Sequence, residues 1–100
     1  MSEPVALRVS IRGRVQAVGF RAYVEHAALT HGVEGWVRNR RDGSVEAVFA
    51  GPAERVATVI EACRHGPGGA RVEAIDEFPA GPDEVSRRYS GELFSVLPTA

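Results

Sequence analysis

GRVQAVGFR, which runs from Gly13 to Arg21, marks the place where one apolar pattern of this sequence gives way to another. From Val5 to Ile11 apolar residues occupy every second position, which is the period of a strand with one buried face. From Phe20 onward they recur at helical spacing, and Gly32 follows at a position typical of a helix stop. The stretch is therefore predicted to be a loop that joins a strand to a helix.

A hairpin and a second helix are predicted to follow. Asp42-Gly43 is a strong hairpin signal, and it separates two short β-prone segments, Val33–Arg38 and Ser44–Ala50. After them, Pro52 is expected in the first turn of a helix, where its missing N–H costs nothing. The apolar residues beyond Pro52 again recur at helical spacing, so this helix should bury one stripe.

The remainder of the chain predicts one more strand and completes a βαββαβ order. The second helix is expected to end at Gly66, a strand covers Arg71–Phe78, and Leu93–Leu97 adds a short edge strand after a turn-rich segment. Two helices on one face of an antiparallel sheet, in the ferredoxin-like split βαβ arrangement, bury both helical stripes economically. We therefore expect an α+β fold with the first strand placed centrally, and a single domain over residues 1–100.

The composition is that of a globular protein. Hydrophobic residues make up 44% and charged residues 25% of the chain, and no apolar run approaches the about 20 residues that span a bilayer. A net charge of −1 argues against general nucleic-acid binding through phosphate neutralisation. We expect a cytoplasmic protein with no nucleic-acid or membrane partner, in which the single cysteine, Cys63, is a buried and unreactive thiol.

The loop before the first helix combines three features that attract anions. The first N–H groups of a helix lack intrahelical partners and carry a partial positive charge, and glycines let the preceding N–H groups converge on one point. Arg21 would stand in the first turn, where a cation is unfavourable by about 0.3–1 kcal/mol unless an anion is bound. Spacing alone leaves anion binding open, because glycine-containing loops are common and this one matches neither GxGxxG nor the P-loop pattern.

Two stretches resemble known motifs. GRVQAVGFR resembles the acylphosphatase signature G-x-V-Q-G-V-x-F-R, and GWVRNRRDGSVE, from Gly35 to Glu46, resembles the second motif of that family, G-W-V-x-N-x-x-D-G-x-V-E. The likeness covers roughly Val5 to Phe78. It implies a small ferredoxin-like hydrolase that cleaves the carboxyl–phosphate bond of acyl phosphates and uses neither a metal ion nor a cofactor.

The resemblance also implies roles for individual residues. Arg21 corresponds to the family arginine that binds the phosphoryl oxygens, and Asn39 to the asparagine that orients the attacking water. The loop amides that complete the phosphate cradle correspond to Val15, Gln16, Ala17, Val18, Gly19 and Phe20. Without the resemblance, Asn39 would be read as a turn residue before the hairpin tip. Because an amide has no useful proton affinity, the proton of the water would have to go elsewhere, for example to the phosphate of the substrate.

Three features depart from the family pattern. Ala17 replaces a glycine, and if that position needs a positive φ, alanine costs on the order of 1 kcal/mol and could tilt the cradle amides. His31 replaces a leucine that usually precedes the helix-stop glycine. The tail, ELFSVLPTA, lacks the usual aromatic and basic ending, so the last strand is expected to be short or frayed.

A different class of function is compatible with the same residues. A non-catalytic ferredoxin-like module that senses an anion or binds a partner is the alternative, because this fold carries many unrelated functions and Ala17 could impair catalysis. RNA binding on the open sheet face would need exposed aromatic platforms and net basicity. The leading expectation is a monomeric acylphosphatase.

Overall fold

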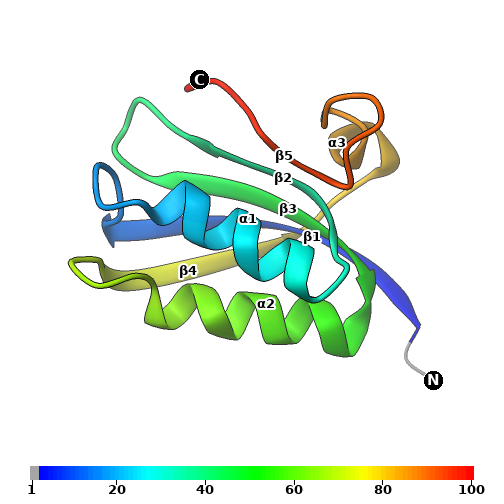
Figure 1. Cartoon of the computed structure of the whole chain (residues 1–100), viewed down its shortest axis with the longest axis horizontal. Helices are drawn as coiled ribbons and strands as arrows, with labels where there is room; N and C mark the ends of the chain where they lie inside the picture. The colour runs from blue at the N-terminus through cyan, green and yellow to red at the C-terminus, as the bar shows by residue number, and fades with distance from the viewer. Residues whose placement is uncertain (1–2) are drawn as a thin grey trace.

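A five-stranded sheet carries two long helices on one face in the computed structural model, which describes residues 3–100 (Figure 1). The elements in chain order are β1 (Pro4–Arg14), α1 (Phe20–Thr30), β2 (Glu34–Asn39), β3 (Val45–Pro52), α2 (Ala53–His65), β4 (Arg71–Pro79), α3 (Pro82–Val85) and β5 (Phe94–Val96). The βαββαβ order and the ferredoxin-like arrangement agree with the prediction. The short helix α3 lies in the segment that was expected to be rich in turns, and no helix was predicted there.

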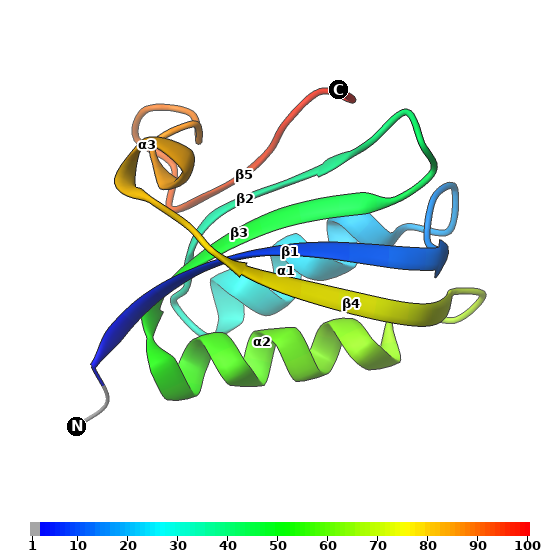
Figure 2. The ribbon, with the colours of Figure 1, turned by 180° about the vertical axis from the view of Figure 1, so that it is seen from behind.

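The sheet has the strand order β4-β1-β3-β2-β5. β1 lies between β3 and β4 and pairs antiparallel with both, so the first strand is interior, as predicted. The expectation of a wholly antiparallel sheet was wrong at one edge, because β5 pairs parallel with β2. In Figure 2 the strands pass in front of α1, and β4 and β5 form the two edges of the sheet.

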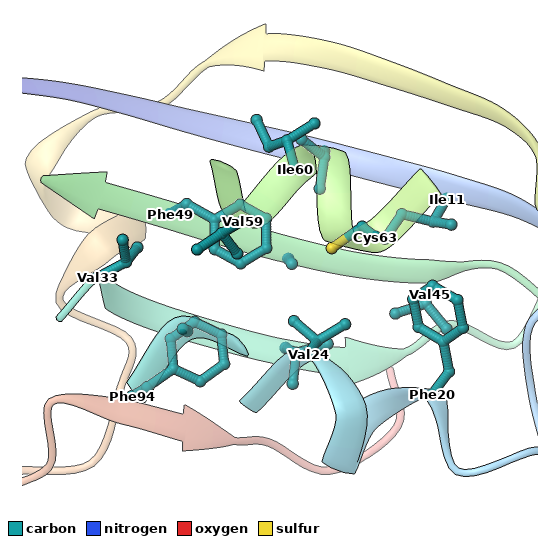
Figure 3. Packing of buried hydrophobic residues seen from close by; sticks show 14 of the residues in the cluster. Ile11, Phe20, Val24, Val33, Val45, Phe49, Val59, Ile60, Cys63 and Phe94 are labelled. Atoms are coloured by element: carbon teal, nitrogen blue, oxygen red, sulfur yellow. The ribbon is translucent and has the colours of Figure 1, made fainter. Parts of the chain in front are cut away.

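The main core lies between the sheet and the two long helices. Alternate residues of β1 such as Val9 and Ile11 are fully buried, in agreement with their predicted strand period. Figure 3 shows side chains from both helices, among them Val24 and Cys63, meeting the apolar side chains of β3. Cys63 is buried as expected, and burial raises the pKa of its thiol to about 12.

A second, smaller cluster covers part of the opposite face of the sheet. It contains Trp36, Val48 and Leu97, with Val85 of α3 packed against it. The indole N–H of Trp36 donates to the backbone carbonyl oxygen of Glu84 at 2.6 Å, so the buried ring keeps a hydrogen bond. The central strands are therefore buried on both faces where α3 folds over them.

Ion pairs occupy the next part of this face. Glu46 of β3 is 9% exposed, and its carboxylate forms ion pairs with three guanidinium groups. The nitrogen-to-oxygen distances are 2.7 Å to Arg38, 3.3 Å to Arg40 and 3.6 Å to Arg8. Arg8 also pairs with Glu84 at 3.3 Å. Because alternate strand residues face opposite sides, these arginines lie on the face away from the helices.

The boundaries of α2 and β5 differ from the sequence expectation. Pro52 is the last residue of β3 and the N-cap of α2, with φ −55° and ψ 135°, rather than a first-turn residue. β5 is short, as expected, but it is not frayed. The N–H of Leu97 donates to Val37 at 2.9 Å and that of Ala100 to Asn39 at 3.1 Å, so the chain follows β2 beyond the strand itself. None of the helices within residues 3–100 has the length and apolar character of a membrane span.

Candidate active site

A cavity of about 330 Å³ lies at the end of the molecule where the β1–α1 loop approaches the end of β2 (Figure 1). Its wall is built from the loop, the first two turns of α1, the last residue of β2 and the C-terminal strand. The lining residues are Val15, Ala17, Gly19, Phe20, Arg21, Ala22, Glu25, Asn39 and Val96. Residues from both sequence motifs thus share one concave surface.

The loop that forms the floor of this cavity has an unusual backbone. Ala17 has φ 60° and is the one residue other than glycine with a positive φ within residues 3–100, and Gly19 has φ 79°. The first hydrogen bond of α1 runs from the N–H of Tyr23 to the carbonyl of Gly19 at 3.1 Å. In the described part of the chain, the N–H groups of residues 15–22 donate to no acceptor. The curled loop and the helix start therefore leave a run of unpaired donors.

The N-terminus of α1 also lacks the groups that usually neutralise a helix start. α1 has no capping side chain and no acidic residue in its first turn. By contrast, the first turn of α2 contains Glu54, and that of α3 contains Asp83 and Glu84. The partial positive charge of this helix end is thus left for a bound anion to balance.

Arg21 adds a full positive charge to the same place. It lies in the first turn of α1, is half-buried and lines the cavity. No carboxylate among residues 3–100 lies within ion-pair distance of it, whereas Arg8, Arg38 and Arg88 are each paired. A cation at a helix start without an anion is unfavourable, so the arrangement would be stabilised by a bound phosphoryl group.

Asn39 reaches the cavity from the sheet. It is the last residue of β2, pairs in register with Val45 and stands on the helix-covered face, because Val37 two residues earlier is in the main core. The backbone carbonyl of Asn39 accepts a hydrogen bond from Ala100. No hydrogen bond from its side-chain amide to another part of residues 3–100 is found, so the amide is available to a bound molecule.

Two of the predicted cradle residues do not line the cavity. Gln16 turns its side chain toward the β2–β3 turn and donates to the backbone carbonyl of Ser44 at 2.8 Å. Val18 packs against the main core. Their N–H groups still belong to the unpaired run of residues 15–22. The remaining predicted residues line the cavity, and binding of substrate by each of them stays a prediction.

The turn that carries Asn39 is internally braced. Asp42 accepts hydrogen bonds from the N–H of Ser44 at 2.9 Å and from its hydroxyl at 2.6 Å. These bonds, the hydroxyl bond first, lower the pKa of the Asp42 carboxyl below its ordinary value. The turn is thus stabilised by the hydrogen bonds between Asp42 and Ser44 within it and by the hydrogen bonds that Gln16 donates to it.

Sequence reasoning missed three residues of the cavity wall. Glu25 follows Arg21 by four positions along α1, so helical spacing could have placed it beside Arg21, whereas Ala22 is its neighbour in the sequence only. Val96 could not have been found in this way, because it reaches the cavity through the parallel pairing of β5 with β2.

Comparison with known proteins identifies the family. The family model for acylphosphatases matches residues 7–90. An acylphosphatase from Bradyrhizobium diazoefficiens is 59% identical over 93% of this chain and 94% of the relative, and one from Rhodopseudomonas palustris is 57% identical over 95% and 96%. The crystal structure of acylphosphatase from Bacillus subtilis has a TM-score of 0.80 at 33% identity and covers 93% of this chain and 98% of that one. The chain therefore belongs to the acylphosphatase family.

Proposed function

We propose that this protein hydrolyses the carboxyl–phosphate bond of acyl phosphates in the cavity at the start of α1. The observation that carries the proposal is the unpaired run of N–H groups at residues 15–22, beside an arginine that no carboxylate of the described chain engages. Such a concave set of donors suits a tetrahedral dianion. Asn39, which lines the same cavity, supplies the group that would hold a water molecule.

In this proposal the loop amides and Arg21 bind the phosphoryl oxygens. Arg21 grips two oxygens at once, which is stronger and more directional than a neutral hydrogen bond. The N–H groups are fixed before substrate arrives, so they stabilise charge in the transition state without reorganisation. Each such donor contributes about 10² to 10³ in rate in enzymes where one has been removed.

Asn39 positions the attacking water and does not act as a base. The water oxygen forms a bond to phosphorus, the bond from phosphorus to the acyl oxygen breaks, and its electron pair leaves with the carboxylate. One water proton passes to a phosphoryl oxygen, so that an acyl phosphate dianion and water yield a carboxylate and dihydrogen phosphate. The leaving carboxylate is stable without protonation, so positioning and charge stabilisation can carry the reaction.

The setting of this reaction is also part of the proposal. The protein would act as a cytoplasmic monomer and a single domain over residues 1–100, with a small-molecule substrate and without a metal ion. Family membership does not favour the alternative, a non-catalytic module that senses an anion or binds a partner.

The direct test is hydrolysis of benzoyl phosphate in the presence of excess chelator. We expect turnover to persist, and we expect Asn39→Ala to abolish it while the inhibition constant of inorganic phosphate changes by less than about threefold. Loss of phosphate binding together with turnover would mean that Asn39 acts structurally. Saturable phosphate binding by the unmodified protein without any product would select the non-catalytic alternative.

Arg21→Lys separates charge from geometry at the phosphoryl site. It keeps the positive charge but loses the planar fork, so kcat/KM should fall by about 10² or more. Arg55→Lys is the matched control, because Arg55 is exposed on α2 and is not among the residues that line the cavity. Near-normal activity of the Arg21 variant would refute bidentate binding.

A further inference from the structure

Glu25 is the one acidic residue among those that line the cavity. It follows Arg21 by four residues on α1, so both side chains lie on the same face of the helix. Glu25 is half-buried, and no cation within residues 3–100 lies at ion-pair distance from it. Arginine followed by glutamate is the less favourable order for a pair at this spacing, which agrees with the absence of a bond between them.

A lone carboxylate beside a phosphate site needs a physical explanation. It weakens binding of the phosphoryl dianion itself, and once Arg21 is engaged by phosphate, nothing on the described cavity wall neutralises Glu25. Glu25 lines the same cavity as Arg21 and Asn39, so an acyl part that extends from the phosphoryl group along this side of the cavity approaches the carboxylate. A charge on the acyl part would then interact with the carboxylate, more strongly the less water lies between them.

We propose that Glu25 determines specificity for the acyl group: it selects acyl phosphates whose acyl part is neutral or cationic and discriminates against those with a second carboxylate. This inference rests on the function proposed above and extends it to the substrate class. The phosphoryl group is common to all acyl phosphates, so its repulsion from Glu25 cancels when two substrates are compared. What remains is the charge of the acyl part.

Two aromatic substrates of nearly equal size test the proposal. 4-Carboxybenzoyl phosphate carries the second negative charge, and 4-carbamoylbenzoyl phosphate is its neutral counterpart. For the unmodified protein, kcat/KM should be about five- to tenfold higher for the neutral substrate, as expected for two like charges about 6–8 Å apart in a partly solvated site. In Glu25→Gln this ratio should fall to within about twofold of one, and in Glu25→Lys it should invert.

The control is Asp83→Asn, which changes the net charge of the protein as Glu25→Gln does but lies on α3, over the other face of the sheet. Its ratio should equal that of the unmodified protein. Added salt should reduce the ratio of the unmodified protein, because ions screen the repulsion.

Other outcomes would overturn the proposal. An equal fall in kcat on both substrates for Glu25→Gln, with loss of the acid limb of the pH profile, would instead make Glu25 a general base. Identical ratios in all variants would remove Glu25 from specificity while leaving the hydrolytic function intact. Failure to hydrolyse both of these substrates and benzoyl phosphate as well would overturn the proposed function, and the specificity role with it.

Discussion

The side-chain amide of Gln16 donates a hydrogen bond of 2.7 Å to the backbone carbonyl of Arg40, which lies 24 residues further along the chain. The same nitrogen donates to Ser44. Gln16 stands in the loop with the unpaired N–H groups, and Arg40 directly follows Asn39. One side chain therefore fixes the position of the proposed phosphate cradle relative to the residue proposed to hold the water.

Gln16→Ala should lower kcat more than it weakens phosphate binding. The N–H groups and Arg21 would remain, but Asn39 could shift relative to them, and such misplacement costs about tenfold to 10² in rate. Loss of two hydrogen bonds should also lower the free energy of unfolding by about 1–2 kcal/mol. Steady-state kinetics with benzoyl phosphate, inhibition by inorganic phosphate and denaturant unfolding measure the three quantities.

Gln16→Glu is the stricter comparison for this role. It keeps the length of the side chain but presents a carboxylate to two carbonyl oxygens, so its kcat should be lower than that of the alanine variant. Wild-type kcat in both variants would show that the bridge to Arg40 does not position the site.

Ala17→Gly should stabilise the protein. Ala17 has φ 60°, a left-handed conformation that costs a residue with a Cβ atom about 1–2 kcal/mol. Glycine removes this strain, but it also makes the unfolded chain more flexible, and this lowers the free energy of unfolding by about 0.4–1 kcal/mol. The free energy of unfolding should therefore rise by a few tenths to about 1 kcal/mol, as measured by denaturant titration. Ala17→Val should lower it, since β-branched residues are the most strained at positive φ, and the reverse order would exclude strain at this position.

The fold could be predicted because local patterns and packing agree along most of the chain. The alternation from Val5 to Ile11 and the helical spacing after Phe20 each specify a buried face, and the structure buries both faces in one core. The short helix α3 and the parallel pairing of β5 could not be predicted in this way. Both depend on tertiary contacts, namely the hydrogen bond from Trp36 to Glu84 and the pairing of β5 with β2.

The candidate site was predictable to the extent that it lies within the two motifs. Arg21 and Asn39 were placed in one site from the resemblance, and both line the same cavity in the structure. The condition stated for Ala17, a positive φ, is met, whereas the cost of alanine there and its effect on the cradle amides stay predictions. Glu25 was missed because no motif contains it, and its significance emerges only from the cavity wall, where residues 3–100 supply no other acid.

Glu46→Gln should destabilise the protein by about 1–3 kcal/mol. Glu46 is nearly buried and balances three arginines, so removal of its charge leaves Arg38, which is 15% exposed, without its closest partner. Breaking a fully buried ion pair costs about 3–5 kcal/mol. Arg8 and Arg40 are partly exposed, so water compensates part of the lost interaction and the expected loss of stability is smaller. Denaturant unfolding measures the loss.

Asp76→Asn is the matched control for Glu46. It removes the partner of Arg12 in a pair whose side chains are 59% and 47% exposed, and exposed pairs contribute about 0–1 kcal/mol. Equal effects of the two substitutions would mean that the ion pairs of Glu46 contribute no more to stability than one exposed pair. Kinetic constants should change little in either variant, because neither residue lines the cavity.

Cys63 should make the stability of the protein fall at alkaline pH. Burial raises the pKa of its thiol to about 12 in the folded protein, from an ordinary value of 9.0, so between these values the unfolded chain releases a proton that the folded protein retains. The contribution of the protonated thiol to the free energy of unfolding is fully present below pH 9. It is lost as the pH rises toward 12, by up to about 1.4 kcal/mol per pH unit. Cys63→Ala should be less stable at neutral pH, because it leaves a small cavity, but its stability should not fall in this way at alkaline pH.

Denaturant unfolding of both proteins between pH 8 and 10.5 isolates the effect of the thiol, because the other titrating groups are common to the two proteins. Parallel pH profiles would mean that the thiol ionises equally well in the folded and unfolded states.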